Sequence, residues 1–147
     1  MEEIRNPDLR RLYDYWSEKR GEREMPSRAD LDPLDMTFIM GNVILVDVLS
    51  ETPPRFRIRL HGTNLVQYVG YELTGKMLDE LPQTEFREAA RQTFTHVFKT
   101  RAPFRHRRDR IIEDRLHRYE TVVMPLSSDG EQVDRLLVGL IYDDERR

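Results

Sequence analysis

The stretch RFRIRLHGTNLVQYVGYELTGKML, residues 55–78, decides the fold of this chain. It opens with strict alternation that places Phe56, Ile58 and Leu60 on one face, and this alternation predicts a strand. The other face of the strand carries basic side chains: Arg55, Arg57, Arg59 and His61. Glycines then interrupt the segment: Gly62, Gly70 and Gly75. A chain that breaks this often around apolar side chains is expected to wrap a pocket.

The chain before this stretch begins with a well-signalled helix. Asn6 is a suitable N-cap, Pro7 suits the first helical position, and Gly21 is a suitable stop. An apolar stripe follows the i, i+3, i+4, i+7 spacing of one helical face: Leu9, Leu12, Tyr13 and Trp16. A second, short helix is expected over residues 34–41.

The remaining pattern predicts further strands and one long helix. The strands are expected at residues 43–49, 104–112, 117–126 and 133–142, and the helix at residues 84–100. Short turns, ETPP and SSDGEQ, join neighbouring strands, so these strands pair antiparallel. Strands on both sides of a helical middle predict the α+β class, with one antiparallel sheet of about five strands. Helices are expected on one face of this sheet, with the N-terminal helix as an extra element.

Composition restricts the function. The chain has 147 residues, 35% of them charged, and a net charge of −3, which argues against nucleic acid as the main partner. It has no cysteine, which excludes disulfides, thiolate catalysis and cysteinyl-flavin chemistry. It also lacks an apolar run of the ~20 residues that a membrane span requires, so a cytoplasmic location is expected.

The segments LYDYW, MPSRADLDP, VILVDV, PPRFRIRLHGT and LTGKMLDELP follow one another in this order. With these segments the chain resembles a bacterial family of small single-domain PAS proteins, over residues 9–142. The resemblance implies a PAS-like domain at residues 26–147. It also implies an N-terminal helix and connector at residues 1–25 that act in dimerisation.

PAS domains as a class are sensory and interaction modules, usually dimeric, and some hold a small molecule between sheet and helices. The resemblance therefore implies a non-catalytic sensory or regulatory module that binds a small ligand, an unidentified signalling protein, or both. Because no kinase, cyclase or DNA-binding segment follows the last strand, the module is expected to stand alone.

The expected pocket lies between the sheet and the middle helices. Phenols and a thioether among aliphatic side chains suit a small-molecule cavity with a few polar handles. The candidate ligand-binding residues are Leu65, Tyr68, Phe94, Phe98, Tyr119, Met124 and Tyr142. The alternative is a filled core, in which the same side chains only pack together.

No catalytic residue or metal ligand is predicted, and the sequence does not identify a cofactor, although it disfavours haem and a cysteinyl-flavin. His96 is the candidate axial ligand for haem, but on the long helix it falls opposite Phe94 and Val97, which predicts that it faces solvent. His61 shares the arginine face of its strand and is expected to be exposed or associated with the following loop. The sequence contains no phosphate-binding glycine loop, nucleophile elbow or metal-ligand spacing, so an enzyme is not expected.

Two further surfaces carry functional hypotheses. Seven arginines lie between Arg101 and Arg118, and with Arg55, Arg57 and Arg59 they could form a basic sheet face for an anionic partner. The simpler alternative is that these arginines pair with carboxylates on adjacent strands. The stripe of Leu9, Leu12, Tyr13 and Trp16 suits either packing on its own sheet or a homodimer interface. A ligand-free adaptor that works through the basic face is the alternative to the sensor.

Overall fold

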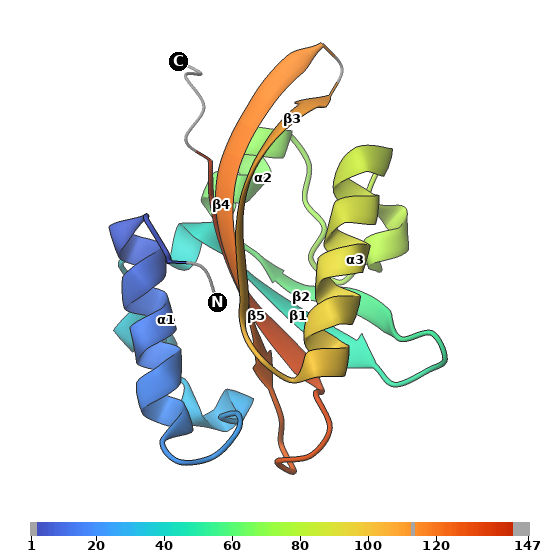
Figure 1. Ribbon diagram of the computed structural model, residues 1–147. Helices are drawn as coiled ribbons and strands as arrows, with labels where there is room; N and C mark the ends of the chain where they lie inside the picture. The colour runs from blue at the N-terminus through green and yellow to red at the C-terminus, as the bar shows by residue number, and fades with distance from the viewer. Residues whose placement is uncertain (1–2, 113, 143–147) are drawn as a thin grey trace.

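The centre of the protein is one antiparallel sheet with the strand order β2-β1-β5-β4-β3 (Figure 1). Its strands are β1 (Val43–Leu49), β2 (Arg55–His61), β3 (Phe104–Ile112), β4 (Arg115–Leu126) and β5 (Arg135–Tyr142). This computed structural model describes residues 3–112 and 114–142, without the side chains of residues 110 and 112. Each neighbouring pair of strands is antiparallel, which confirms the predicted α+β fold.

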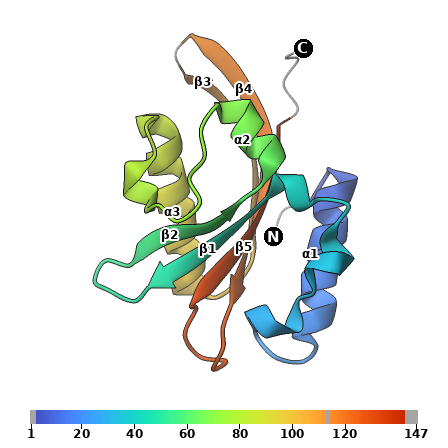
Figure 2. The same ribbon diagram turned by 180° about the vertical axis from the view of Figure 1, so that it is seen from behind.

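Helices cover both faces of the sheet (Figures 1 and 2). One face carries α2 (Thr63–Val69), the 3₁₀ turn η4 (Leu78–Glu80) and the long helix α3 (Thr84–Thr100). The opposite face carries α1 (Pro7–Arg20). Short 3₁₀ turns follow α1: η1 (Arg28–Asp30), η2 (Pro33–Met36) and η3 (Met40–Asn42). The short helix expected over residues 34–41 forms as two separate 3₁₀ turns, η2 and η3, because so short a segment gains too few hydrogen bonds to offset the nucleation of a continuous helix.

Helix α1 forms where its capping residues predict it. The side chain of Asn6 accepts hydrogen bonds from the backbone N–H groups of Asp8 and Leu9. Gly21 follows the last turn with a φ of 60°, a conformation that glycine adopts without steric cost. These caps satisfy backbone groups that the helix leaves unpaired at its two ends.

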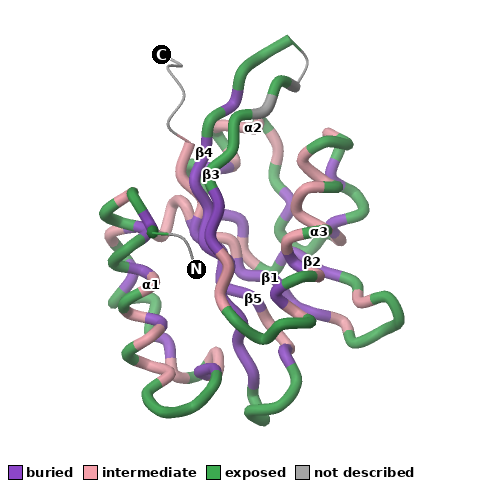
Figure 3. Tube along the Cα trace, in the orientation of Figure 1, coloured by how far each residue is buried: buried purple, intermediate pink, exposed green. Residues whose placement is uncertain are grey.

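Strand β5 alternates between two cores, one on each face of the sheet. Val138 lines the face under α2 and α3, whereas Gly139 lies against α1. A Cβ atom at position 139 would lie 2.7 Å from Cδ2 of Leu9 and 2.8 Å from Cδ2 of Leu12. The missing side chain of Gly139 therefore allows α1 to approach the sheet closely. Buried residues accordingly line the middle strands, with exposed ones at the loops and hairpin tips (Figure 3).

The start of α1 is fixed to the sheet by a buried carboxylate. Glu120 on β4 accepts hydrogen bonds of 2.8 Å from the backbone N–H groups of both Arg5 and Asn6. It also pairs with the guanidinium of Arg105 at 2.8 Å, and both side chains are at least nine-tenths buried. Burial opposes the ionisation of Glu120, but these donors outweigh it and lower the pKa of Glu120 below its usual value. The described part of the N-terminal segment thus belongs to the same core as the sheet.

Candidate functional site

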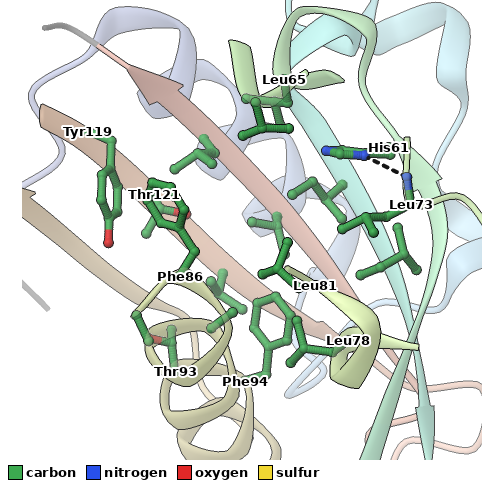
Figure 4. Close-up of a pocket in the computed structure, with 18 of the residues that line it drawn as sticks. His61, Leu65, Leu73, Leu78, Leu81, Phe86, Thr93, Phe94, Tyr119 and Thr121 are labelled. Atoms are coloured by element: carbon green, nitrogen blue, oxygen red, sulfur yellow. Dashed lines mark hydrogen bonds between the residues drawn. The ribbon is translucent and has the colours of Figure 1, made fainter. Parts of the chain in front are cut away.

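A cavity of about 130 Å³ lies between the sheet and the helices α2 and α3 (Figure 4). The sheet contributes one wall, and α2, α3 and the loop that contains η4 contribute the other. Its lining is almost entirely apolar or aromatic: Ile44, Ile58, His61, Leu65, Val69, Tyr71, Leu73, Leu78, Leu81, Phe86, Ala89, Ala90, Thr93, Phe94, His106, Tyr119, Thr121, Val123, Val138, Leu140 and Tyr142. No Asp, Glu, Lys or Arg side chain lies among these lining residues.

Small side chains on α3 leave this space open. Phe86 and Phe94 lie about two turns apart on the helix, and both line the cavity. The residues between them that line it are small, namely Ala89, Ala90 and Thr93. Because a larger side chain at any of these positions would extend toward the sheet, the residue sizes on α3 set the volume of the cavity.

A β-bulge in β2 turns one polar residue toward the cavity. Leu45 of β1 pairs with Leu60, whereas the next residue, Val46, pairs with Ile58. Arg59 is therefore an extra residue in β2. Beyond such a bulge the alternation of side chains is reversed, because successive residues of a strand point to opposite faces.

His61 is the residue that this reversal affects. It pairs with Ile44 of β1, and both side chains line the cavity. His61 is only 9% exposed, so of the two predicted alternatives the exposed one was wrong, whereas the association with the following loop agrees with its contact with Leu73. Strict alternation along RFRIRLH gave no signal of the bulge, and this functional candidate was therefore missed.

The ring of His61 holds the loop that covers the cavity. Its Nδ1 atom accepts a hydrogen bond from the backbone N–H of Leu73, at 3.2 Å (Figure 4). The Oε2 atom of Glu72 lies 3.3 Å from the same Nδ1. Burial lowers the pKa of His61, and the carboxylate of Glu72 opposes this shift only in part. The ring is therefore neutral near pH 7, in the state that lets Nδ1 act as an acceptor.

Several aromatic rings pack beside one end of the cavity. Tyr68 of α2 stacks on Tyr142, with ring centroids 3.5 Å apart, and its hydroxyl lies 2.7 Å from Nδ1 of His117. Phe86 and Tyr119 contact Tyr142 edge to face. This cluster ties α2 and α3 to the ends of β4 and β5.

The structure brings together four of the seven residues predicted to bind a ligand. Leu65, Phe94, Tyr119 and Tyr142 line the cavity. Tyr68 does not line it but supports Tyr142 from behind. These positions came from the helical spacing of α3 and the strand pattern around Tyr119.

The other two predicted residues lie elsewhere. Met124 is completely buried, but it lies five residues after Tyr119 on β4 and therefore points to the opposite face of the sheet. Phe98 lies one turn beyond Phe94 on α3, where it packs against the core outside the cavity. Their assignment to the cavity was wrong. Apolar character alone shows neither on which face of the sheet Met124 lies nor that the cavity ends before Phe98 on α3.

The N-terminal stripe is covered by its own sheet. Leu9, Leu12 and Trp16 are 0% exposed in the single chain, and the indole N–H of Trp16 donates to the carbonyl of Pro125 at 3.0 Å. Tyr13 is half-buried and stacks beside Trp16. Three of the four predicted interface residues are thus not available on the surface, so a dimer through them would require α1 to leave its sheet. The homodimer itself stays a prediction.

The arginines of the sheet pair with carboxylates, as the simpler alternative predicts. Arg57 and Arg59 both contact Asp47, at 3.2 and 2.9 Å, and Arg135 contacts it at 3.2 Å. Burial opposes the ionisation of Asp47, but these guanidiniums outweigh it and lower its pKa. Arg105 pairs with Glu120. Three guanidiniums share one carboxylate at Asp47, which leaves an excess of positive charge there.

Three observations concern the haem, metal and membrane sites that were considered from the sequence. His96 is exposed on α3, as its helical position predicts. Across residues 3–112 and 114–142, the structure contains no group of three or more side chains that could hold a metal ion. Within these residues no helix is both long and apolar enough to cross a membrane.

A five-stranded antiparallel sheet that closes a cavity with α2, η4 and α3 on one face is the architecture of the PAS fold. A family model described as PAS domain matches residues 4–142. The chain belongs to the PAS domain family. No curated protein sequence gives a significant match.

Solved PAS structures share the fold at low sequence identity. The PAS domain of BvgS from Bordetella pertussis is 18% identical, with a TM-score of 0.56, over 79% of this chain and 90% of that domain. A light-oxygen-voltage protein from Rhodobacter sphaeroides is 14% identical, with a TM-score of 0.52, over 78% of this chain and 70% of that protein. At such identities these similarities show the fold alone.

Proposed function

We propose that this chain is a sensory module that binds a small, mostly apolar molecule in the cavity between the sheet and α3. The observation that carries the proposal is the cavity itself, with its apolar lining and about 130 Å³ of space. A cavity of roughly 150 Å³ lined by Leu, Ile and Phe binds benzene in another protein. The expected ligand therefore has about the size of one six-membered ring.

The volume also limits which cofactors fit. Pockets for drug-sized molecules measure roughly 300–1,000 Å³, more than twice the space found here. Haem and the tricyclic ring of a flavin are larger than one six-membered ring, so neither fits this cavity. A flavin bound as a cysteinyl adduct also requires a thiol, and the chain has no cysteine.

The test uses benzene as the probe and methyl NMR spectra as the readout. Benzene is expected to shift the methyl resonances of the lining residues Leu65 and Val138. Ala90→Leu, which extends a side chain into the cavity, is expected to abolish these shifts. Gln92→Leu introduces the same side chain at an exposed position of α3 and serves as the matched control.

If benzene does not shift the methyl resonances of the wild-type protein, the sensor proposal is contradicted. This result would favour the second candidate, a ligand-free adaptor that binds an anionic partner through its basic sheet face. One observation favours this candidate, namely the excess positive charge where Arg57, Arg59 and Arg135 share Asp47.

A further inference from the structure

His61 is a buried polar side chain of the cavity wall, and its two ring nitrogens differ in their contacts. The side chain is 6% exposed, and the ring lies in the wall of a mostly apolar cavity. The contacts of Nδ1 with Leu73 and Glu72 account for one ring nitrogen. Within the described part of the chain, the other nitrogen, Nε2, has no hydrogen-bond partner. Figure 4 shows this nitrogen on the side of the ring away from Leu73.

The hydrogen bond from Leu73 fixes where the proton of the neutral ring lies. A backbone N–H can only donate, so the Nδ1 atom that faces it must be the unprotonated nitrogen. A neutral imidazole carries one proton, which therefore lies on Nε2. The opposite arrangement, with a proton on Nδ1 directed to Glu72, would lose this hydrogen bond and leave the N–H of Leu73 only the adjacent carboxylate of Glu72, which it also contacts.

We infer that the ligand of this cavity is a small neutral molecule with one hydrogen-bond acceptor, such as a carbonyl oxygen, which binds the Nε2–H of His61. This inference rests on the proposed sensor function and narrows its ligand class. The apolar remainder of the lining disfavours a charged ligand, because burying an unpaired charge costs far more than burying a neutral dipole. A pure hydrocarbon would fill the space but leave the Nε2–H without a partner.

Thr121 does not compete for this role. Its hydroxyl donates to the carbonyl of Gly139 at 2.8 Å, so its proton is already used within the sheet. The Oγ1 atom of Thr121 can still accept, but it cannot supply the donor that a carbonyl requires. Thr121 therefore adds no donor to the one that His61 offers.

The first test reads the imidazole of the wild-type protein directly. Two probes of equal shape are compared, cyclohexanone, which carries a carbonyl group, and methylenecyclohexane, which carries a CH₂ group in its place. Nitrogen-15 NMR of the histidine side chains is expected to show His61 protonated on Nε2. The Nε2 resonance should shift with cyclohexanone and stay in place with methylenecyclohexane. An unprotonated Nε2, or an equal response to both probes, would overturn the inference.

The second test uses two variants that separate the nitrogens of the ring. His61→Asn keeps a polar atom near the position of Nδ1 and removes the donor to the cavity, whereas His61→Gln keeps a donor near Nε2. The ratio of the affinities for cyclohexanone and methylenecyclohexane cancels differences in solubility between the probes. This ratio is expected to fall about two- to tenfold in His61→Asn, the worth of one hydrogen bond. His61→Gln should keep most of it.

The outcomes separate the two proposals. If both probes bind but all three proteins show the same ratio, the sensor proposal stands and the role of His61 is wrong. If neither probe shifts any resonance of the lining residues, the sensor proposal fails and the ligand class fails with it.

Discussion

Trp16 offers the sharpest test of how the N-terminal helix packs. The side chain is 0% exposed against its own sheet, and its indole N–H donates to the carbonyl of Pro125 at 3.0 Å. Trp16→Ala removes the largest buried side chain of α1, and such truncations lower the free energy of unfolding by about 3–5 kcal/mol. Trp16→Phe keeps most of the apolar contact but leaves the buried carbonyl without its donor, at about 1–3 kcal/mol.

Urea unfolding followed by far-UV circular dichroism measures both changes. Domains of this kind have a total stability of roughly 5–15 kcal/mol, so Trp16→Ala should shift the midpoint by a large fraction of its value. Leu34→Ala is the control, because Leu34 is 78% exposed and its truncation should change stability by less than about 0.5 kcal/mol.

Two results would refute packing of α1 on its own sheet. The first is a loss below about 1 kcal/mol in Trp16→Ala, which would mean that the indole is not buried as described. The second is a midpoint that rises with protein concentration in the wild type but not in Trp16→Ala, because mass action stabilises only an assembly of chains and the variant removes the stripe's tryptophan. That second result would move the stripe of Leu9, Leu12 and Trp16 to a partner chain and support the predicted homodimer.

Two further predictions follow from the packing of the sheet and the burial of His61. Gly139→Val should lower stability by about 1–3 kcal/mol in thermal unfolding, because its side chain would overlap Leu9 and Leu12, 2.7 and 2.8 Å from the Cβ position; an unchanged midpoint would contradict this. The pKa of His61 is lowered from 6.5, so the unfolded state binds its proton more readily. Stability is therefore complete above about pH 6.5 and declines as the pH falls toward the lower native pKa. Subtracting the pH profile of His61→Gln should remove this decline, and parallel profiles would show that His61 does not cause it.

Much of the fold could be predicted because local signals agreed with the global structure. Asn6 and Gly21 delimit α1, and the strand predicted at residues 104–112 coincides with β3. Short turns gave the antiparallel pairing, and the apolar face of α3 gave Phe94 as a cavity residue. These features depend on residues close in sequence, so the pattern within each segment carries the information.

The rest depends on contacts between segments. The bulge at Arg59 arises from the pairing of β1 with β2, and neither strand alone shows that His61 turns inward. Met124 was placed on the wrong face because apolar character does not distinguish the two sides of a sheet that is covered on both. The packing of α1 on its own sheet depends on Gly139, which lies more than a hundred residues away in the sequence. A glycine within a strand pattern indicates an interruption of the strand and gives no sign of the helix that packs there.

The neighbouring residues Val138 and Gly139 give this sheet a mechanical consequence. Val138 faces the cavity, and Gly139 receives Leu9 and Leu12 of α1 on the other side. Adjacent residues of β5 thus contact the cavity on one face of the sheet and α1 on the other. A molecule in the cavity that bends or flattens β5 would therefore change the packing of α1 directly, without a movement of the loops. The one tryptophan of the chain lies on that helix, so its fluorescence can report the displacement without an added label.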